Sequence, residues 1–169
     1  TLFRPAFPIG HEMTASIVAL SDDVTGLRIG DSCIVNFQLV CGACAACQAS
    51  HSPACTTVPF GSNYGLGRQA AQWGGGVSEL VKVPFARAML FPIPGGLSPI
   101  HLSSLSDNMT DAYRTVAPGL AKDPGSSVLI IGGVAWSIAC YAILLARALG
   151  AGKITFVDVD ADRLAFAGG

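Results

Sequence analysis

The chain has 169 residues, with 10 Lys and Arg against 11 Asp and Glu, so its formal net charge is −1. This charge excludes a nucleic-acid-binding protein that relies on bulk positive charge. Apolar residues make up 51% of the chain and charged residues 12%, which excludes a disordered segment and is sufficient for a buried core. We therefore expect a folded protein that does not bind nucleic acid.

The first half of the chain is expected to form a small β-rich unit. Short β-leaning runs, such as 16–20 and 33–37, alternate with turn residues. A polar, glycine-rich stretch at 60–76 is interpreted as a long surface loop, and 78–83 as a further strand. Pro and Gly residues at 92–96 then predict the end of this unit's regular structure.

Four of the six cysteines follow the spacing C-x-x-C-x-x-C-x₇-C. They are Cys41, Cys44, Cys47 and Cys55. Four thiolates with small residues between the first three can enclose one ion in a closed tetrahedral site, as a structural zinc requires. A disulfide pair and an iron–sulfur cluster are the alternatives, although bacterial ferredoxins place three residues before the fourth Cys, where seven stand here. The clustering favours zinc in a reducing compartment, so we expect a cytoplasmic protein.

A helix that links two units is predicted after Leu102. Apolar residues recur at helical spacing from Leu105 to Val116, and Pro118-Gly119 predicts the end of the helix. We accordingly expect a β-rich domain at 1–121, which contains the zinc lobe and this helix.

The second domain, at 122–169, is expected to begin a dinucleotide-binding sheet. An apolar strand at 128–131, a helix at 136–149 and a second apolar strand at 154–157 predict a βαβ unit with a parallel sheet. The uncharged stretch 125–146 is long enough for a membrane span, but its glycine interruption and the second strand favour the βαβ unit. The fold class is therefore α/β, and no membrane is expected as a partner. A complete sheet of this type needs about six strands, so we expect a chain truncated at both ends.

The turn after the first of these strands departs from the dinucleotide fingerprint G-x-G-x-x-G. Gly132 is in register, but Val134 and Ser137 occupy the places of the second and third glycines. Backbone amides at the start of the helix can still bind an anion. The candidate cofactor-binding residues at this turn are Gly132, Gly133, Val134, Ala135 and Trp136.

Asp158 ends the second strand of the βαβ unit. A carboxylate there can accept hydrogen bonds from both ribose hydroxyls and repels a 2′-phosphate, so it favours NAD over NADP. The alternative is that Asp158 only caps the strand.

Gly10, His11 and Glu12 complete a pattern that resembles the zinc-dependent medium-chain alcohol dehydrogenases. That family's signature begins Gly-His-Glu, and the resemblance extends through the cysteine cluster and the βαβ unit over essentially the whole chain. It implies a GroES-like catalytic domain with a structural zinc lobe, followed by the first βαβ of a Rossmann domain.

The resemblance also implies the catalytic residues. His11 would bind a catalytic zinc with Glu12 beside the metal, and Asp107 would be a further ligand, as in the branch of the family that uses Asp in place of Cys. Asp107 as a helix N-cap is the alternative. Asp111 stands where many members carry Thr near the nicotinamide. The remaining ligand, a Cys, is implied upstream of this chain.

These residues imply an NAD-dependent zinc alcohol dehydrogenase, an oxidoreductase that transfers a hydride between an alcohol, aldehyde or ketone and NAD. The full-length protein is expected to be a homo-oligomer that acts on a small molecule. The isolated chain is expected to be inactive. The alternative is a non-enzymatic, zinc-stabilised module whose dinucleotide site has decayed, as Val134 and Ser137 would suggest.

Overall fold

The structure is a computed structural model that describes residues 8–168, and its contacts divide the chain after Asp107 into two units. We call them the β-rich unit and the C-terminal unit. The division places the linking helix in the C-terminal unit, whereas the sequence grouped that helix with the β-rich domain. The helix packs on the second helix of the C-terminal unit through Ala112, Val116 and Leu120, which are buried in that unit's core.

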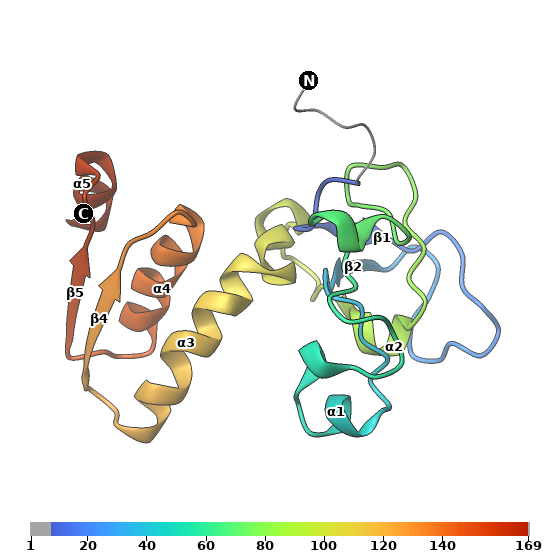
Figure 1. Cartoon of the computed structure of the whole chain (residues 1–169), viewed down its shortest axis with the longest axis horizontal. Coiled ribbons are helices and arrows are strands. Elements are labelled where there is room, and N and C mark those ends of the chain that lie inside the picture. Colours follow the sequence, from blue (N-terminus) through green and yellow to red (C-terminus); the bar gives the residue numbers. More distant parts are fainter. Residues whose placement is uncertain (1–7, 169) are drawn as a thin grey trace. The chain divides into compact units, whose positions relative to one another are not determined.

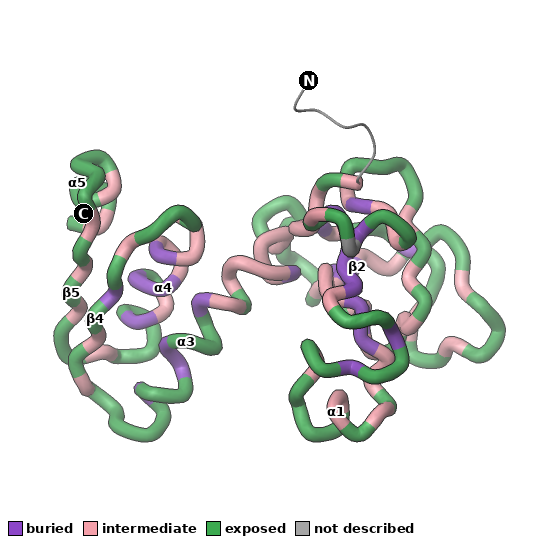
Figure 2. The backbone as a smooth tube through the Cα atoms, viewed as in Figure 1, coloured by how far each residue is buried: buried purple, intermediate pink, exposed green. Residues whose placement is uncertain are grey.

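Three short antiparallel strands organise the β-rich unit. They are β1 (Thr14–Ser16), β2 (Ser32–Val35) and β3 (Leu90–Pro92), with β2 in the middle (Figure 1). Cys33 and Val35 are fully buried while Ile34 between them is half-buried, because alternate side chains of a strand point to opposite faces. Buried positions accordingly recur along β2 in Figure 2.

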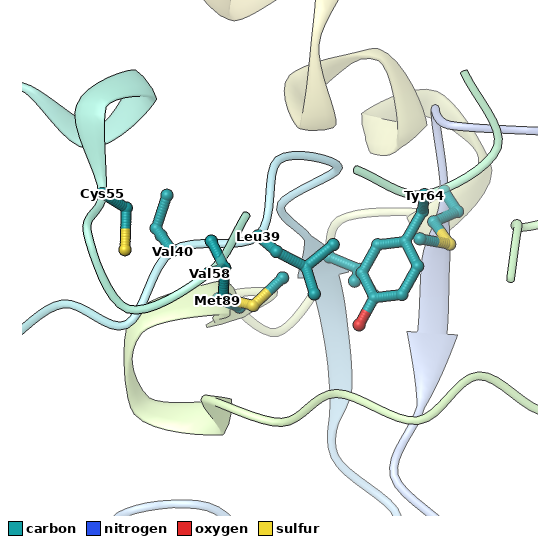
Figure 3. Close-up of a cluster of buried hydrophobic side chains, with 8 residues drawn as sticks. Leu39, Val40, Cys55, Val58, Tyr64 and Met89 are labelled. Atoms are coloured by element: carbon teal, nitrogen blue, oxygen red, sulfur yellow. The ribbon is translucent and has the colours of Figure 1, made fainter. Parts of the chain in front are cut away.

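The core of this unit packs around Tyr64 and Met89, both fully buried (Figure 3). The Tyr64 hydroxyl donates a hydrogen bond to the carbonyl of Lys82 at 2.6 Å, so its polar end is satisfied inside the core. The other buried members of this cluster are Met13, Val35, Leu39, Val40, Cys55 and Val58.

Three expectations for this unit are wrong. Of the expected run 16–20, only Ser16 lies in a strand, as the last residue of β1. Residues 78–83 form no strand, and the Lys82 carbonyl accepts the Tyr64 hydroxyl in place of a ladder hydrogen bond. The stretch 60–76 is irregular as expected, but it is not confined to the surface, because Tyr64 and Ala70 are fully buried. The other elements of the unit are short helices: α1 (Ala45–Gln48), η1 (Ser52–Ala54), η2 (Arg68–Ala70), α2 (Ala86–Met89) and η3 (Pro99–Ser106).

The C-terminal unit is the predicted βαβ arrangement with a helix before it and another after it. Its elements are α3 (Asn108–Lys122), β4 (Ser127–Ile131), α4 (Trp136–Ala148), β5 (Lys153–Val157) and α5 (Ala161–Gly168). Strands β4 and β5 are parallel, and α4 packs against them while α3 packs on α4 (Figure 1). The α/β fold class is confirmed.

Helix α3 continues through Pro118, where the sequence predicted its end. Proline removes the hydrogen bond to the carbonyl four residues earlier and costs about 3 kcal/mol in a helix interior. Pro118 itself is exposed, whereas Ala117 just before it and Leu120 just after it are buried, and this burial offsets the cost.

One face of the β4–β5 sheet is exposed in the part of the chain that the structure describes. Leu129, Ile131 and Val157 are each more than half exposed, although the apolar strands predicted a sheet covered on both faces. Within residues 8–168, no helix has the length and apolar character that crossing a membrane requires.

Candidate metal sites and dinucleotide turn

The four clustered cysteines meet around one point in the β-rich unit. Their Sγ atoms all lie within 4.8 Å of one another, with 4.0 Å between Cys41 and Cys47 and 3.9 Å between Cys44 and Cys55. Zn–S bonds of about 2.3 Å in a tetrahedron place the sulfurs about 3.8 Å apart. None of the four is in a disulfide. The cluster therefore fits a structural zinc.

Hydrogen bonds to the Cys41 sulfur favour its thiolate form, which is the form that binds a metal cation. The amides of Ala43 and Cys44 point at its Sγ from 3.4 and 3.3 Å, and the Thr57 hydroxyl donates to the same sulfur at 3.0 Å. Such hydrogen bonds stabilise a thiolate. Cys55 is buried in the core cluster beside Val40 (Figure 3), so the lobe that carries the four sulfurs is anchored to the core of the unit.

The thiols differ in acidity. Backbone amides of Cys47 and Thr56 lower the pKa of Cys44 to about 5, and the Thr57 hydroxyl lowers the pKa of Cys41 below its usual value. Desolvation raises the pKa of Cys47 to about 12. The Cys47 thiol thus keeps its proton at neutral pH, and a divalent cation would replace that proton with its own charge.

Two further side chains of a type that can bind a metal come from the beginning and the end of the β-rich unit. Nε2 of His11 is 3.2 Å from Oδ2 of Asp107. Two ligands of one tetrahedral zinc at the usual N and O bond lengths are separated by about 3.4 Å. The His11 ring also meets Phe37 edge to face at 5.7 Å between centroids. The arrangement can therefore offer one nitrogen and one oxygen to a single metal ion.

Glycines allow the close packing that places His11. Gly10 has φ of +89°, and its carbonyl accepts the Gly76 amide at 2.7 Å. A Cβ on Gly65 would overlap the Gly10 backbone. The stretch 65–77 thus lies directly against the segment that carries His11, and only residues without side chains fit at this approach.

The other expected catalytic residue, Glu12, is half-buried next to His11. Asp107 directly precedes the first residue of α3, so it also occupies the position of a helix N-cap. Among residues 8–168, the one group of three or more side chains that could hold a metal is the cysteine cluster. The pair of His11 and Asp107 could therefore offer two of the three protein ligands that a catalytic zinc requires.

In the C-terminal unit, Asp158 lies against the predicted dinucleotide turn. A Cβ on Gly132 would overlap the Asp158 carboxylate, so glycine is required there. Oδ1 of Asp158 accepts the amides of Val159 and Asp160, and these hydrogen bonds, with that of Asp160 the stronger influence, hold the pKa of this carboxyl below its usual value.

The second oxygen of Asp158 is ion-paired with Arg163 but makes no hydrogen bond in the described part of the chain. The Asp158 side chain is 4% exposed. A ribose hydroxyl could supply the hydrogen bond that this buried oxygen lacks. The residues present at this edge therefore fit a dinucleotide.

Arg163 crosses the same turn. Its Nη1 donates to the carbonyl of Gly133 at 2.7 Å and lies 3.6 Å from Oδ2 of Asp158, an ion pair too long for a hydrogen bond. The guanidinium also lies over the Trp136 ring at 5.6 Å. Val134, at the place of the second fingerprint glycine, is fully exposed.

The comparison with known proteins identifies the β-rich unit. Residues 1–95 match the family described as the alcohol dehydrogenase GroES-like domain. The chain belongs to the zinc-dependent alcohol dehydrogenase family. The resemblance seen in the sequence is thereby confirmed.

The relatives of this chain are longer than the chain itself. The glutathione-independent formaldehyde dehydrogenase of Pseudomonas aeruginosa is 35% identical over 167 residues, which cover 94% of this chain and 41% of that protein. The formaldehyde dismutase of Pseudomonas putida is 31% identical over 92% of this chain and 40% of its own length. The chain thus spans about two fifths of these curated relatives.

A solved structure also resembles this chain. The alcohol dehydrogenase TADH from Thermus sp. ATN1 matches with a TM-score of 0.85 and 30% identity, over 95% of this chain and 44% of that one.

Three residues that make contacts at these sites were not predicted from the sequence. Thr57 contacts Cys41, Arg163 contacts Gly133, and the Ser106 hydroxyl contacts the backbone of Met13. Thr57 stands two residues after Cys55, a proximity that could have drawn attention to it. Arg163 and Ser106 carry no such signal, because their partners lie 30 and 93 residues away.

Proposed function

We propose that the full-length protein is an NAD-dependent zinc oxidoreductase that transfers a hydride between a small alcohol, aldehyde or ketone and NAD. The observation that carries this proposal is the distance of 3.2 Å between the ligating atoms of His11 and Asp107, inside a domain of the zinc-dependent alcohol dehydrogenase family. The Oδ2 of Asp158, which makes no hydrogen bond within the described residues, supports NAD as the second substrate.

The roles follow from the chemistry of each side chain. A zinc ion at this site supplies Lewis-acid polarisation of a substrate oxygen, and NAD supplies or accepts the hydride. Neutral His11 offers Nε2 as a nitrogen ligand, and the Phe37 edge limits rotation of its ring. Asp107 offers a negatively charged oxygen. Glu12 lies beside this pair, and the third ligand is proposed to come from a Cys upstream of Thr1.

The dinucleotide turn has its own proposed roles. Asp158 would accept the ribose hydroxyls through Oδ2, and the amides at the start of α4, with Gly132, Gly133, Val134, Ala135 and Trp136, would face the pyrophosphate. The exposed Val134 is the feature that favoured a decayed site. The family membership of the chain, and the carboxylate oxygen of Asp158 that still lacks a hydrogen bond within the described residues, favour a working site instead.

The test is a kinetic assay of the full-length protein. We expect NAD reduction, followed by nicotinamide absorbance, with at least one member of a panel of alcohols and aldehydes that includes formaldehyde, which the names of two relatives specify. His11→Ala should abolish turnover and leave the structural zinc in place. His101→Ala removes an exposed imidazole of η3 and serves as the matched control, with wild-type turnover expected. Turnover that survives His11→Ala would overturn the proposal.

We also propose that the protein works in the cytoplasm as a homo-oligomer. The six cysteines are all free, which suits a reducing compartment. Fractionation of the cells and sedimentation of the full-length protein check these two points. A periplasmic or secreted protein, or a monomer at working concentration, would contradict them.

A further inference from the structure

A buried serine ties together the two segments that carry the proposed zinc ligands. Ser106 is 5% exposed, and its Oγ accepts the Met13 amide at 2.8 Å. Met13 is two residues from His11, and Ser106 is the neighbour of Asp107. One hydrogen bond therefore joins positions 93 residues apart, directly beside both ligands.

The other polar groups at this contact fix the direction of the Ser106 hydroxyl. The Met13 carbonyl already accepts the Val35 amide at 3.2 Å. The Ser106 hydrogen has the Ser103 carbonyl at 2.6 Å and the Met13 carbonyl at 3.1 Å within reach, and the shorter contact is the stronger one. When the Ser106 hydroxyl donates its hydrogen to the Ser103 carbonyl, the lone pairs of its oxygen are available to accept the Met13 amide. The Met13 amide, the Met13 carbonyl and the Ser106 hydroxyl then each have a hydrogen-bond partner within the chain.

We propose that Ser106 is a positioning residue that sets the separation of His11 and Asp107 for the metal. This inference rests on the proposed function, because it concerns the same site. Helix η3 packs across β1 and β2. A second hydrogen bond joins η3 to this region, from the Thr14 hydroxyl to the Pro99 carbonyl, but it is long at 3.4 Å and lies at the first residue of η3, away from Asp107. The shorter hydrogen bond, from the Met13 amide to Ser106, lies at the end of η3 that is next to Asp107.

The physical requirement is geometric. Zinc sites hold their ligands to within about 0.2 Å of the ideal distances, whereas apolar packing tolerates larger sliding of one element along another. A directional hydrogen bond beside each ligand restricts that sliding. Removal of the hydroxyl would also leave the Met13 amide buried without an acceptor, which favours a shift of the Met13 backbone away from η3.

The experiment compares Ser106→Ala with Ser106→Thr in the full-length protein. Zinc affinity of each of the two sites is measured by competition with a chelator, and thermal stability is recorded in parallel. We expect Ser106→Ala to weaken the zinc at His11 and Asp107 by about tenfold and to leave the cysteine-bound zinc unchanged. Ser106→Thr keeps a hydroxyl and should restore most of the affinity. Ser103→Ala is the matched control, because its hydroxyl bonds only the local Ile100 carbonyl.

The outcomes separate this inference from the proposed function. If wild type binds zinc at both sites and Ser106→Ala binds zinc at His11 and Asp107 with the wild-type affinity, the positioning role is overturned and the proposed function stays intact. If wild type binds zinc only at the cysteine cluster, both are overturned. If Ser106→Ala does not fold, Ser106→Thr and Ser106→Val replace it as a pair of equal shape, and equal zinc affinity in these two would overturn the positioning role.

Discussion

At the scale of single residues, the cysteine cluster shows how sequence spacing becomes a metal site. The small residues between Cys41 and Cys47 allow a tight turn in which amides reach the Cys41 sulfur. The sequence predicted the four ligands from their spacing alone. It did not predict Thr57, because a hydroxyl that supports a thiolate has no required position in the chain.

We expect Cys44→Ser to remove the structural zinc and lower the free energy of unfolding by several kcal/mol. A closed thiolate site contributes metal-binding energy directly to folding, and serine is a poor zinc ligand. Cys140→Ser, which changes a half-buried thiol of α4 outside the cluster, should keep the metal. Zinc analysis and denaturant unfolding measure both effects. Iron with visible absorption in the wild-type protein would contradict the assignment.

Asp158→Asn should weaken NAD binding by about tenfold or more, because a charged acceptor of ribose hydroxyls becomes a neutral amide. The pKa of Asp158 is held below its usual value, so the carboxylate stays charged as pH falls through the ordinary carboxyl range. Its contribution to NAD affinity should be constant at neutral pH and decline only in stronger acid. Asp162→Asn, on the exposed start of α5, is the control. Calorimetric titration with NAD that shows equal affinity for Asp158→Asn and the control would refute the role.

At the scale of elements, a regular and strongly apolar pattern was predictable, and short or irregular segments were not. Strands β4 and β5 and helix α4 follow from continuous apolar runs that glycine interrupts. Strand β3 has three residues, too few for a period-two pattern to be visible. The pairing of β3 with β2 depends on partners more than fifty residues away in sequence. The continuation of α3 through Pro118 likewise depends on tertiary packing, because Ala117 and Leu120 are buried in the core of the C-terminal unit.

The approach of the 65–77 stretch to Gly10 gives a prediction at this scale. Gly65→Ala should lower the free energy of unfolding by about 1–3 kcal/mol, because its Cβ would overlap the Gly10 backbone and its φ of +59° is strained for alanine. Gly95→Ala, at a glycine with open space around it, should change stability little. Denaturant unfolding of the two variants makes the comparison. Equal stability would show that the contact between Gly65 and Gly10 is not tight in solution.

At the scale of the whole molecule, the two units carry different parts of the proposed activity. The proposed metal ligands His11 and Asp107 belong to the β-rich unit, and Asp158 belongs to the C-terminal unit. The Gly-His-Glu triplet and the cysteine spacing made the family predictable from the sequence. The pairing of His11 with Asp107 came from the resemblance to the family, because nothing in the sequence brings residues 96 positions apart together.

The 169-residue chain expressed alone should show no alcohol-dependent reduction of NAD. Its described residues offer two ligands at His11 and Asp107, and a catalytic zinc needs three. The exposed Leu129, Ile131 and Val157 should also make the isolated chain aggregate. Light scattering and the NAD assay test this expectation. A monodisperse, active 169-residue protein would contradict it.

The most direct test of the central claim is anomalous X-ray diffraction at the zinc edge from crystals of the full-length protein. The account predicts two zinc peaks per chain. One should lie at bonding distance from Cys41, Cys44, Cys47 and Cys55, and the other should bridge Nε2 of His11 and Oδ2 of Asp107. A structure in which His11 and Asp107 hold no metal, while the cysteine site is filled, would contradict the assignment of a catalytic zinc to this chain.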